Sequence, residues 1–447
     1  MDYIINTPCG QVKGVKSKRE GIIAYKGIRY ATANRFEMPK QVTSWEGIYD
    51  ATEYGHCAYQ ARSFYNEEEN LKKIFYYNEF RKGGKYTYSE DCLFLNIFKL
   101  EETKENDNLP VLVYIHGGGF TGGCAHEKHF DVPVWPLKGV IGVTINYRLG
   151  PLGFMALEGL DLNLGLYDQV EALKWIKANI SSFGGNPNNI TIMGQSAGAM
   201  SVQQLCMSPI TKNLFNKAVM NSGGGVSRIL NTCKPEKYYE FNKKVMELTN
   251  SKTVEEFKKV SVESIFNAWT EAKKEIKIMG MVYCPVIDNN LIVDTGINIL
   301  KTNKHHQIPY MMGSTSKDLM VPFMNSMSRN WCKKQSVDSF SWFFNHNLPG
   351  DDSGAWHSSE LWYFFGTLDN SWRPNTEVDY ELSNKMVDYL INFVKTGNPN
   401  GENLPTWEST TKKQKKDMHL GNGIVEMRKT SKLKMWHTLF TNKAVGE

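Results

Sequence analysis

The sequence is short of several features that would mark particular classes of protein. Its 447 residues contain 8 cysteines but no C-x-x-C pair, so neither a structural zinc site nor a thioredoxin-like motif is expected. Polar or charged residues interrupt every apolar run before it could span a membrane. The segment Met1 to Asn6 lacks the basic and apolar parts of a secretory signal. These absences predict a cytoplasmic protein with reduced thiols.

The sequence also lacks a large excess of positive or negative charge. The net charge of +5 is small for a chain of this size, and charged residues make up 22% of it. The nearest approach to a basic patch is the segment 412–416, which is more typical of a solvated loop than of a phosphate-binding surface. We therefore expect no nucleic-acid partner and no membrane partner. The 41% of hydrophobic residues is enough for a large core.

Apolar, β-branched runs alternate with helical patterns along the chain, which indicates a mixed α/β fold. Apolar residues at helical spacing predict helices over 166–180 and 382–394, the second ended by Gly397. The Lys- and Glu-rich middle, 233–275, predicts amphipathic helices outside the sheet, and the segment 63–85 is expected to be a surface loop. The runs expected to be strands are 111–115, 140–145, 190–193, 218–220 and 308–312.

The strongest local motif is Gly-Gln-Ser-Ala-Gly at 194–198. It follows the run 190–193 and precedes a plausible helix start, which is the strand–turn–helix setting of a nucleophile elbow. A sharp turn exposes Ser196, and a side chain at either flanking glycine would collide with neighbouring backbone. A bare G-x-S-x-G is common by chance, so the flanking patterns carry the prediction that Ser196 is a nucleophile.

A second motif, His-Gly-Gly-Gly-Phe at 116–120, directly follows the strand expected at 111–115. An acyl-transfer enzyme must stabilise an oxyanion, and backbone N–H groups do this best when no side chain blocks their approach. The alternative is that the glycine run is a flexible linker, but such linkers do not lie between buried strands. The motif therefore predicts an oxyanion-binding loop.

Together these motifs resemble the type-B carboxylesterase and cholinesterase family of α/β-hydrolases. The resemblance extends from Gly10 to Trp407 and implies an α/β-hydrolase fold: a central, mostly parallel, twisted sheet flanked by helices, with helical excursions over the active site. It also implies one catalytic domain over residues 1–447. Further segments that match the family are SEDCLFLNI at 89–97, NYRLGPLGF at 146–154, LGLYDQ at 164–169 and FGGNP at 183–187.

The resemblance implies a catalytic triad in the chain order Ser, acid, His, and oxyanion donors at the N–H groups of Gly118, Gly119 and Ala197. Among the ten histidines, His357 lies in GAWHSSEL at 354–361, which resembles the catalytic-histidine segment of the family. It is the predicted general base. The pair at 305–306 is expected to be exposed. Three further histidines have no supporting pattern: His346, His419 and His437.

The acid departs from the family pattern. Counting from Gly313 without a gap, Asp318 takes the position at which the family usually has Glu, and Leu319 takes that of a Gly. An Asp can hold the imidazole tautomer, although its shorter side chain requires a closer backbone. Glu360 is the alternative acid.

Two other departures concern specificity and cysteine pairing. Residue 195 is Gln where the family commonly has Glu, which removes a negative charge beside the nucleophile and weakens attraction for cationic substrates. The segment between Cys57 and Cys92 corresponds to the loop that carries the choline-binding Trp of cholinesterases, and it has no Trp. These two cysteines match a disulfide of secreted members, so a disulfide between them is an open alternative to free thiols.

The resemblance thus implies a serine carboxylic ester hydrolase that acts through an acyl-enzyme on small or aromatic carboxylic esters, with no metal and no organic cofactor. Its expected partner is a small-molecule ester, and the chain is expected to be a monomer or homodimer. Two alternatives remain: hydrolysis of thioester, amide or carbamate bonds by the same triad, or a non-catalytic, cholinesterase-like binding protein.

Overall fold

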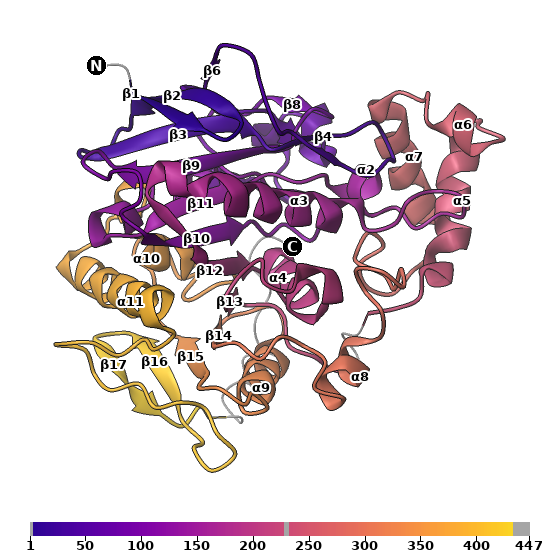
Figure 1. Ribbon diagram of the computed structural model, residues 1–447. Helices are drawn as coiled ribbons and strands as arrows, with labels where there is room; N and C mark the ends of the chain where they lie inside the picture. The colour runs from indigo at the N-terminus through magenta and orange to yellow at the C-terminus, as the bar shows by residue number, and fades with distance from the viewer. Residues whose placement is uncertain (1–2, 228–231, 432–447) are drawn as a thin grey trace.

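The computed structural model describes residues 3–227 and 232–431 (Figure 1). Thirteen of the described strands form one sheet in the order β1-β2-β3-β9-β11-β10-β12-β13-β14-β15-β16-β17, with β6 added beside β2. The antiparallel strands at its N-terminal edge are β1 (Tyr3–Thr7), β2 (Gly10–Lys16), β3 (Ile22–Arg29) and β9 (Phe94–Leu100). The short strand β6 (Ile48–Asp50) pairs parallel to β2.

The centre of the sheet is parallel, as the alternation of strands and helices predicted. It consists of β11 (Ile141–Ile145), β10 (Leu109–Ile115), β12 (Gly185–Gln195), β13 (Lys217–Asn221), β14 (Tyr310–Thr315), β15 (Phe340–Phe344) and β16 (Asp417–Gly421). An antiparallel strand, β17 (Ile424–Arg428), closes the edge. All five expected strands are present, but β14 begins at Tyr310 because Pro309 has no N–H to pair.

Strand β10 shows how the sheet divides the core. Val111, Val113 and Ile115 belong to one buried cluster, together with residues of α3 (Leu164–Asn179) and α4 (Ala197–Met207). Leu112 and Tyr114 belong to the other, with residues of α10 (Leu361–Phe365) and α11 (Glu377–Thr396). Alternate side chains of a strand point to opposite faces, so each face of the sheet is covered by its own pair of helices.

The expected helices are confirmed with longer bounds. Helix α11 begins five residues earlier than its apolar stripe because Thr376 and Asp379 form a capping box, and Gly397 (φ 85°) ends it. The segment 63–85, expected to be a loop, is partly helical: it holds η1 (Ala61–Phe64), η2 (Glu67–Glu69) and α1 (Ile74–Phe80). Further helices are α2 (Gly150–Phe154), α8 (Gly296–Lys301) and α9 (Val321–Cys332).

The helical middle is confirmed as an excursion from the sheet. Helices α5 (Tyr239–Leu248), α6 (Val254–Phe257) and α7 (Val262–Glu275) gather at one side of the molecule, and α5 packs against α7 (Figure 1). No described helix is long and apolar enough to cross a bilayer. All 8 cysteines are free thiols, so Cys57 and Cys92 form no disulfide.

Candidate active site

Ser196 occupies a strained turn between β12 and α4. Its backbone has φ 54° and ψ −123°, a conformation that L-residues rarely adopt. The flanking glycines permit this turn: a Cβ at Gly194 would lie 2.3 Å from the carbonyl oxygen of Gly198, and one at Gly198 would lie 2.1 Å from that of Ile115. The geometry is that of a nucleophile elbow, as the motif predicted.

The glycine loop after β10 lies against this turn. A Cβ on Gly117 would approach the Ser196 Cβ to 3.1 Å, and Gly118 and Gly119 have φ of 113° and 62°. Within the described part of the chain, neither of these two N–H groups donates a hydrogen bond. Ala197 is the first residue of α4, where an N–H has no acceptor inside the helix. Three backbone donors are therefore available beside Ser196.

The predicted acid and base follow neighbouring strands. Asp318 lies in the turn after β14 and His357 in the loop between β15 and α10. A backbone bridge pairs Lys317 with Trp356 and holds the two loops together, with the N–H of Lys317 donating to the Ala355 carbonyl at 2.9 Å. His357 Nδ1 lies 2.6 Å from Asp318 Oδ1. The structure thus brings together the two residues that the sequence assigned as acid and base.

Both groups are buried, and each shifts the titration of the other. Burial opposes ionisation of Asp318, yet the positive charge and hydrogen bond of His357 lower the pKa of this carboxyl. The N–H groups of Thr315 (3.1 Å) and Leu319 (2.9 Å) also donate to it. Burial disfavours the imidazolium, but the Asp318 charge raises the pKa of His357 above its ordinary value. The imidazole is therefore oriented and stabilised as an acceptor of a proton.

Glu360, the alternative acid, is buried close to this pair without bonding to the imidazole. Among the described residues, its carboxylate oxygens have no hydrogen-bond partner. Burial, together with the charge of Asp318, raises the pKa of Glu360 to about 8. Glu360 is consequently uncharged at neutral pH, and Asp318 makes the hydrogen bond to His357 instead.

Gln195 contacts the base directly, which the motif alone did not reveal. Its Nε2 lies 3.2 Å from His357 Nε2, the ring nitrogen that faces away from Asp318. With Nδ1 donating to Asp318, His357 Nε2 is an acceptor, and the amide of Gln195 donates to it. The sequence signal was present in the departure from Glu, but only the fold shows that residue 195 reaches the imidazole.

Ser196, His357 and the glycine loop line one cavity of about 500 Å³. Much of its wall comes from the segment 61–81, which supplies Tyr65, Tyr76 and Phe80. Leu319, which replaces the family Gly beside the acid, also reaches the cavity. The glycine run 223–225 does not line it: a Cβ on Gly223 would lie 2.4 Å from the Ser196 carbonyl oxygen, so this run packs behind the nucleophile.

Charged side chains stand beside the aromatic wall. Arg62 lies 2.8 Å from Glu127 and Arg81 lies 2.7 Å from Glu67. The four side chains are almost fully buried and balance one another in charge. The rim of the cavity is thus polar but close to neutral, apart from Lys73. Among the described residues that line the cavity there is no Trp that could form a cage for a quaternary ammonium group.

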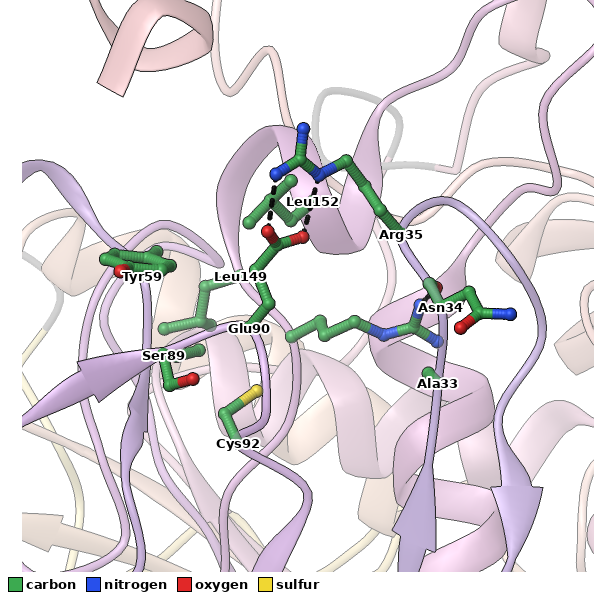
Figure 2. A pocket seen from close by; sticks show the side chains of 11 residues that line it. Ala33, Asn34, Arg35, Tyr59, Ser89, Glu90, Cys92, Leu149 and Leu152 are labelled. Atoms are coloured by element: carbon green, nitrogen blue, oxygen red, sulfur yellow. Dashed lines mark hydrogen bonds and ion pairs between the residues drawn. The ribbon is translucent and has the colours of Figure 1, made fainter. Parts of the chain in front are cut away.

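A second hollow, near Arg35 and Glu90, does not serve as a substrate site (Figure 2). Its volume of about 10 Å³ is room for little more than one water molecule. Arg35 Nε donates to Glu90 Oε2 at 2.8 Å, and the neighbouring Arg148 binds Asp168 at 2.7 Å. These paired charges hold the segment of the family motif at 89–97 in place.

The other histidines make poorer bases. Both ring nitrogens of His346 are occupied: Nε2 faces Asp379 at 2.7 Å and Nδ1 accepts from the Asn422 N–H at 3.0 Å. The expectation that the pair at 305–306 is exposed is wrong, because His305 packs against Trp331 and is only 3% exposed. His437 lies outside the described residues.

The fold and the cavity define an α/β-hydrolase with a serine at the nucleophile turn. The profile of the carboxylesterase family matches residues 1–347 and 322–437. The chain belongs to this family and is a carboxylic ester hydrolase, as the motifs predicted.

Individual relatives agree with this placement. The para-nitrobenzyl esterase of Bacillus subtilis (strain 168) is 30% identical over 92% of this chain and 93% of its own length. Pyrethroid hydrolase Ces2e of Rattus norvegicus is 28% identical over 90% of this chain and 84% of its own length. A solved structure of a PNB esterase superposes with a TM-score of 0.84 at 27% identity, covering 98% of this chain and 99% of the other.

Proposed function

We propose that Ser196 attacks the ester carbonyl, with His357 as general base and Asp318 as the acid that orients it, in one catalytic domain. The hydrogen bond of 2.6 Å between His357 and Asp318, at the wall of the cavity that holds Ser196, carries this proposal. It fixes the imidazole tautomer so that Nε2 carries no proton, and this nitrogen can accept the proton of the serine hydroxyl once that hydroxyl replaces the amide of Gln195 as its donor.

The reaction follows from these positions. As the carbonyl becomes tetrahedral, its oxygen develops negative charge, which the N–H groups of Gly118, Gly119 and Ala197 stabilise. The imidazolium of His357 then protonates the leaving alcohol, and an acyl-enzyme remains on Ser196. A water molecule activated by His357 releases the acid and regenerates the serine.

The cavity supports small or aromatic carboxylic esters as substrates. A volume of about 500 Å³ lies within the range of small-molecule sites, and Tyr65, Tyr76 and Phe80 offer ring faces and edges. The relative that is named a para-nitrobenzyl esterase supports an aromatic alcohol or acyl part. Thioesters, amides and carbamates need the same machinery, so a panel of substrates with one acyl group and different leaving groups identifies the preferred bond.

The replacement Ser196→Ala tests the proposal. We expect a loss of ester turnover by at least about 10³-fold, because the nucleophile is gone while the oxyanion donors remain. A fluorophosphonate probe should label the wild type and not the variant, and circular dichroism should show the same fold. Ser181→Ala, in the short helix Ile180–Phe183 that precedes β12, is the matched control and should retain activity and labelling. Undiminished turnover in S196A would exclude Ser196 as the nucleophile, whereas a wild type with neither turnover nor labelling would favour the non-catalytic binding protein.

The setting of the enzyme completes the proposal. Eight free thiols, most of them buried, support a reducing compartment and hence the cytoplasm. A monomer or homodimer is the proposed form, which sedimentation equilibrium tests directly.

A further inference from the structure

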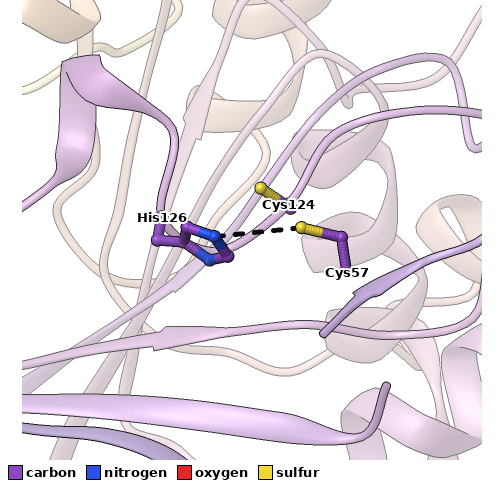
Figure 3. A group of neighbouring side chains, drawn as sticks. All are labelled: Cys57, Cys124 and His126. Carbon is purple, nitrogen blue, oxygen red and sulfur yellow. Dashed lines mark hydrogen bonds between the residues drawn. The ribbon is translucent and has the colours of Figure 1, made fainter. Parts of the chain in front are cut away.

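Three metal-binding side chains meet in the interior, apart from the proposed triad. Cys57 lies in the short strand β7 (Cys57–Ala58), and Cys124 and His126 lie in the loop that continues from the glycine motif (Figure 3). Their ligand atoms all lie within 4.8 Å of one another, and Cys57 Sγ is 3.9 Å from His126 Nε2. The two cysteines are inaccessible to solvent and the histidine is 9% exposed.

The imidazole of His126 is held in a fixed orientation. Its ring stacks on Tyr54, with a centroid distance of 4.4 Å and an interplanar angle of 4°, and on Tyr86 at 5.3 Å and 23°. Two aromatic contacts of this kind restrict rotation of the ring, so Nε2 stays directed at the sulfur atom of Cys57 (Figure 3). A metal ligand that is already oriented loses little freedom on binding.

We propose that Cys57, Cys124 and His126 bind a zinc ion. Two thiolates and an imidazole are a donor set that Zn²⁺ prefers, and bond lengths near 2.3 Å to sulfur and 2.0–2.1 Å to nitrogen place those atoms about 3.6 Å apart in a tetrahedral site. The observed 3.9 Å between Cys57 Sγ and His126 Nε2 needs only a small contraction. A water molecule would complete the tetrahedron.

Charge also favours a divalent ion at this place. The nearest buried charges outside the cluster, Arg62 and Glu127, already pair with each other at 2.8 Å. Two thiolates and a neutral imidazole carry two negative charges, which Zn²⁺ neutralises, whereas a monovalent ion would leave one negative charge buried. Gly123 and Glu127, beside the ligands, line the active-site cavity, which offers a path of entry.

A C-x-x-C pattern does not reveal this site, because its ligands come from two segments that are distant in the sequence. Those segments are already joined: the side chain of Gln60 bonds to both the N–H (2.9 Å) and the carbonyl (3.1 Å) of Gly123. The ion pair between Arg62 and Glu127 joins the same segments, and zinc would add a further link just behind the glycine loop. The inferred role is structural, and it does not depend on the proposed ester hydrolysis.

Zinc titration of the whole, reduced, metal-free protein under anaerobic conditions tests the inference. Calorimetry should show one ion per chain, and titration with Co²⁺ should give a sulfur-to-metal charge-transfer band that requires both thiolates. Cys57→Ser, Cys124→Ser and His126→Gln should each weaken zinc binding by at least about tenfold. Cys9→Ser, which removes a buried thiol elsewhere, is the matched control and should bind as the wild type does.

Two outcomes would overturn the inference. The first is equal zinc affinity in the wild type and in the ligand variants, with circular dichroism showing that His126→Gln is folded. The second outcome would show that Cys57 and Cys124 are a redox pair and not metal ligands. Hydrogen peroxide oxidises two thiols to a disulfide and is itself reduced to two water molecules. Bound zinc should protect Cys57 and Cys124 from this oxidation. If saturating zinc leaves disulfide formation between them unchanged, as mass spectrometry would show, the ion is not bound there.

Discussion

At the scale of single residues, residue 195 sets the electrostatic surroundings of the base. A Gln donates a neutral hydrogen bond to His357 at 3.2 Å, where most of the family places a carboxylate. A neutral donor prefers the uncharged imidazole, whereas a carboxylate would stabilise the imidazolium. The hydrogen bond from Gln195 therefore favours the unprotonated form of His357, the form that can act as a base.

Gln195→Glu should raise the pKa of His357, because a negative charge at 3.2 Å favours the protonated ring. Since the protonated base is inactive, we expect the acid limb of kcat/KM to shift by about one unit to higher pH. The pH profile of ester hydrolysis measures this shift. Gln11→Glu, on β2, adds the same charge far from the site and should leave the profile unchanged. A shift to lower pH would contradict the contact.

The raised pKa of Glu360 should make the free energy of unfolding depend on pH. Its pKa in the folded state is about 8, against an ordinary value of 4.5, so between these values the folded protein holds a proton that the unfolded chain has lost. The free energy of unfolding should therefore fall as pH rises through this window, by up to about 1.4 kcal/mol per unit. Glu360→Gln should remove this part of the slope, as urea unfolding at several pH values would show. An unchanged slope would mean that Glu360 is ionised in the folded protein.

At the scale of elements, the glycine loop acts through its backbone conformation. Gly118 has φ 113°, and a Cβ there would lie 2.1 Å from the carbonyl oxygen of Gly122. Gly118→Ala must therefore displace the loop that carries two of the three proposed oxyanion donors.

We expect this variant to lose about 10²–10³-fold in kcat, the usual cost of one lost oxyanion donor. The matched control is Gly423→Ala in the turn between β16 and β17, which has a similarly positive φ of 72° but nothing within 4 Å. Its kcat should stay within a factor of two of the wild type. Equal kcat for G118A and the wild type would exclude the loop from oxyanion stabilisation.

Elements with a strong period were predictable from the sequence, and those fixed by distant partners were not. The strands around Ser196 and the helix ending at Gly397 follow from apolar runs and from local turn chemistry. Helix α1 has no clear period of its own, because Phe80 and Glu79 are buried by residues almost three hundred positions away. The contact between Gln195 and His357 could not be predicted for the same reason, because it joins residues that are distant in the sequence. The same holds for the cluster of proposed zinc ligands.

At the scale of the whole molecule, one buried ion pair joins the cavity wall to the C-terminal third. Arg373 Nη2 lies 2.7 Å from Glu79 of α1, and each side chain is only 1% exposed. Arg373 also pairs with Asp351 at 2.9 Å, so it is the loss of Arg373 that would leave a buried charge, that of Glu79, without an ion-pair partner.

Arg373→Met should lower the free energy of unfolding by about 3–5 kcal/mol and raise KM, because α1 supplies part of the cavity wall. Thermal unfolding and ester kinetics measure the two effects. Arg428→Met removes an exposed arginine whose pair with Glu426 is about half exposed, and it should change stability by less than about 1 kcal/mol. A matching small effect for R373M would show that the buried pair does not anchor α1.

The positions of β12, β14 and β15 along the chain also set the order in which the parts of the proposed site are synthesised. The chain emerges with the nucleophile turn first, the acid loop next and the histidine loop last. When β14 has left the ribosome, the emerged chain already contains Ser196 and the glycine loop. At that point His357 is still inside the ribosomal tunnel or has not yet been added to the chain. With the proposed triad, the growing chain lacks its general base until the loop after β15 has been made, so ester hydrolysis would begin only as the C-terminal strands complete the sheet.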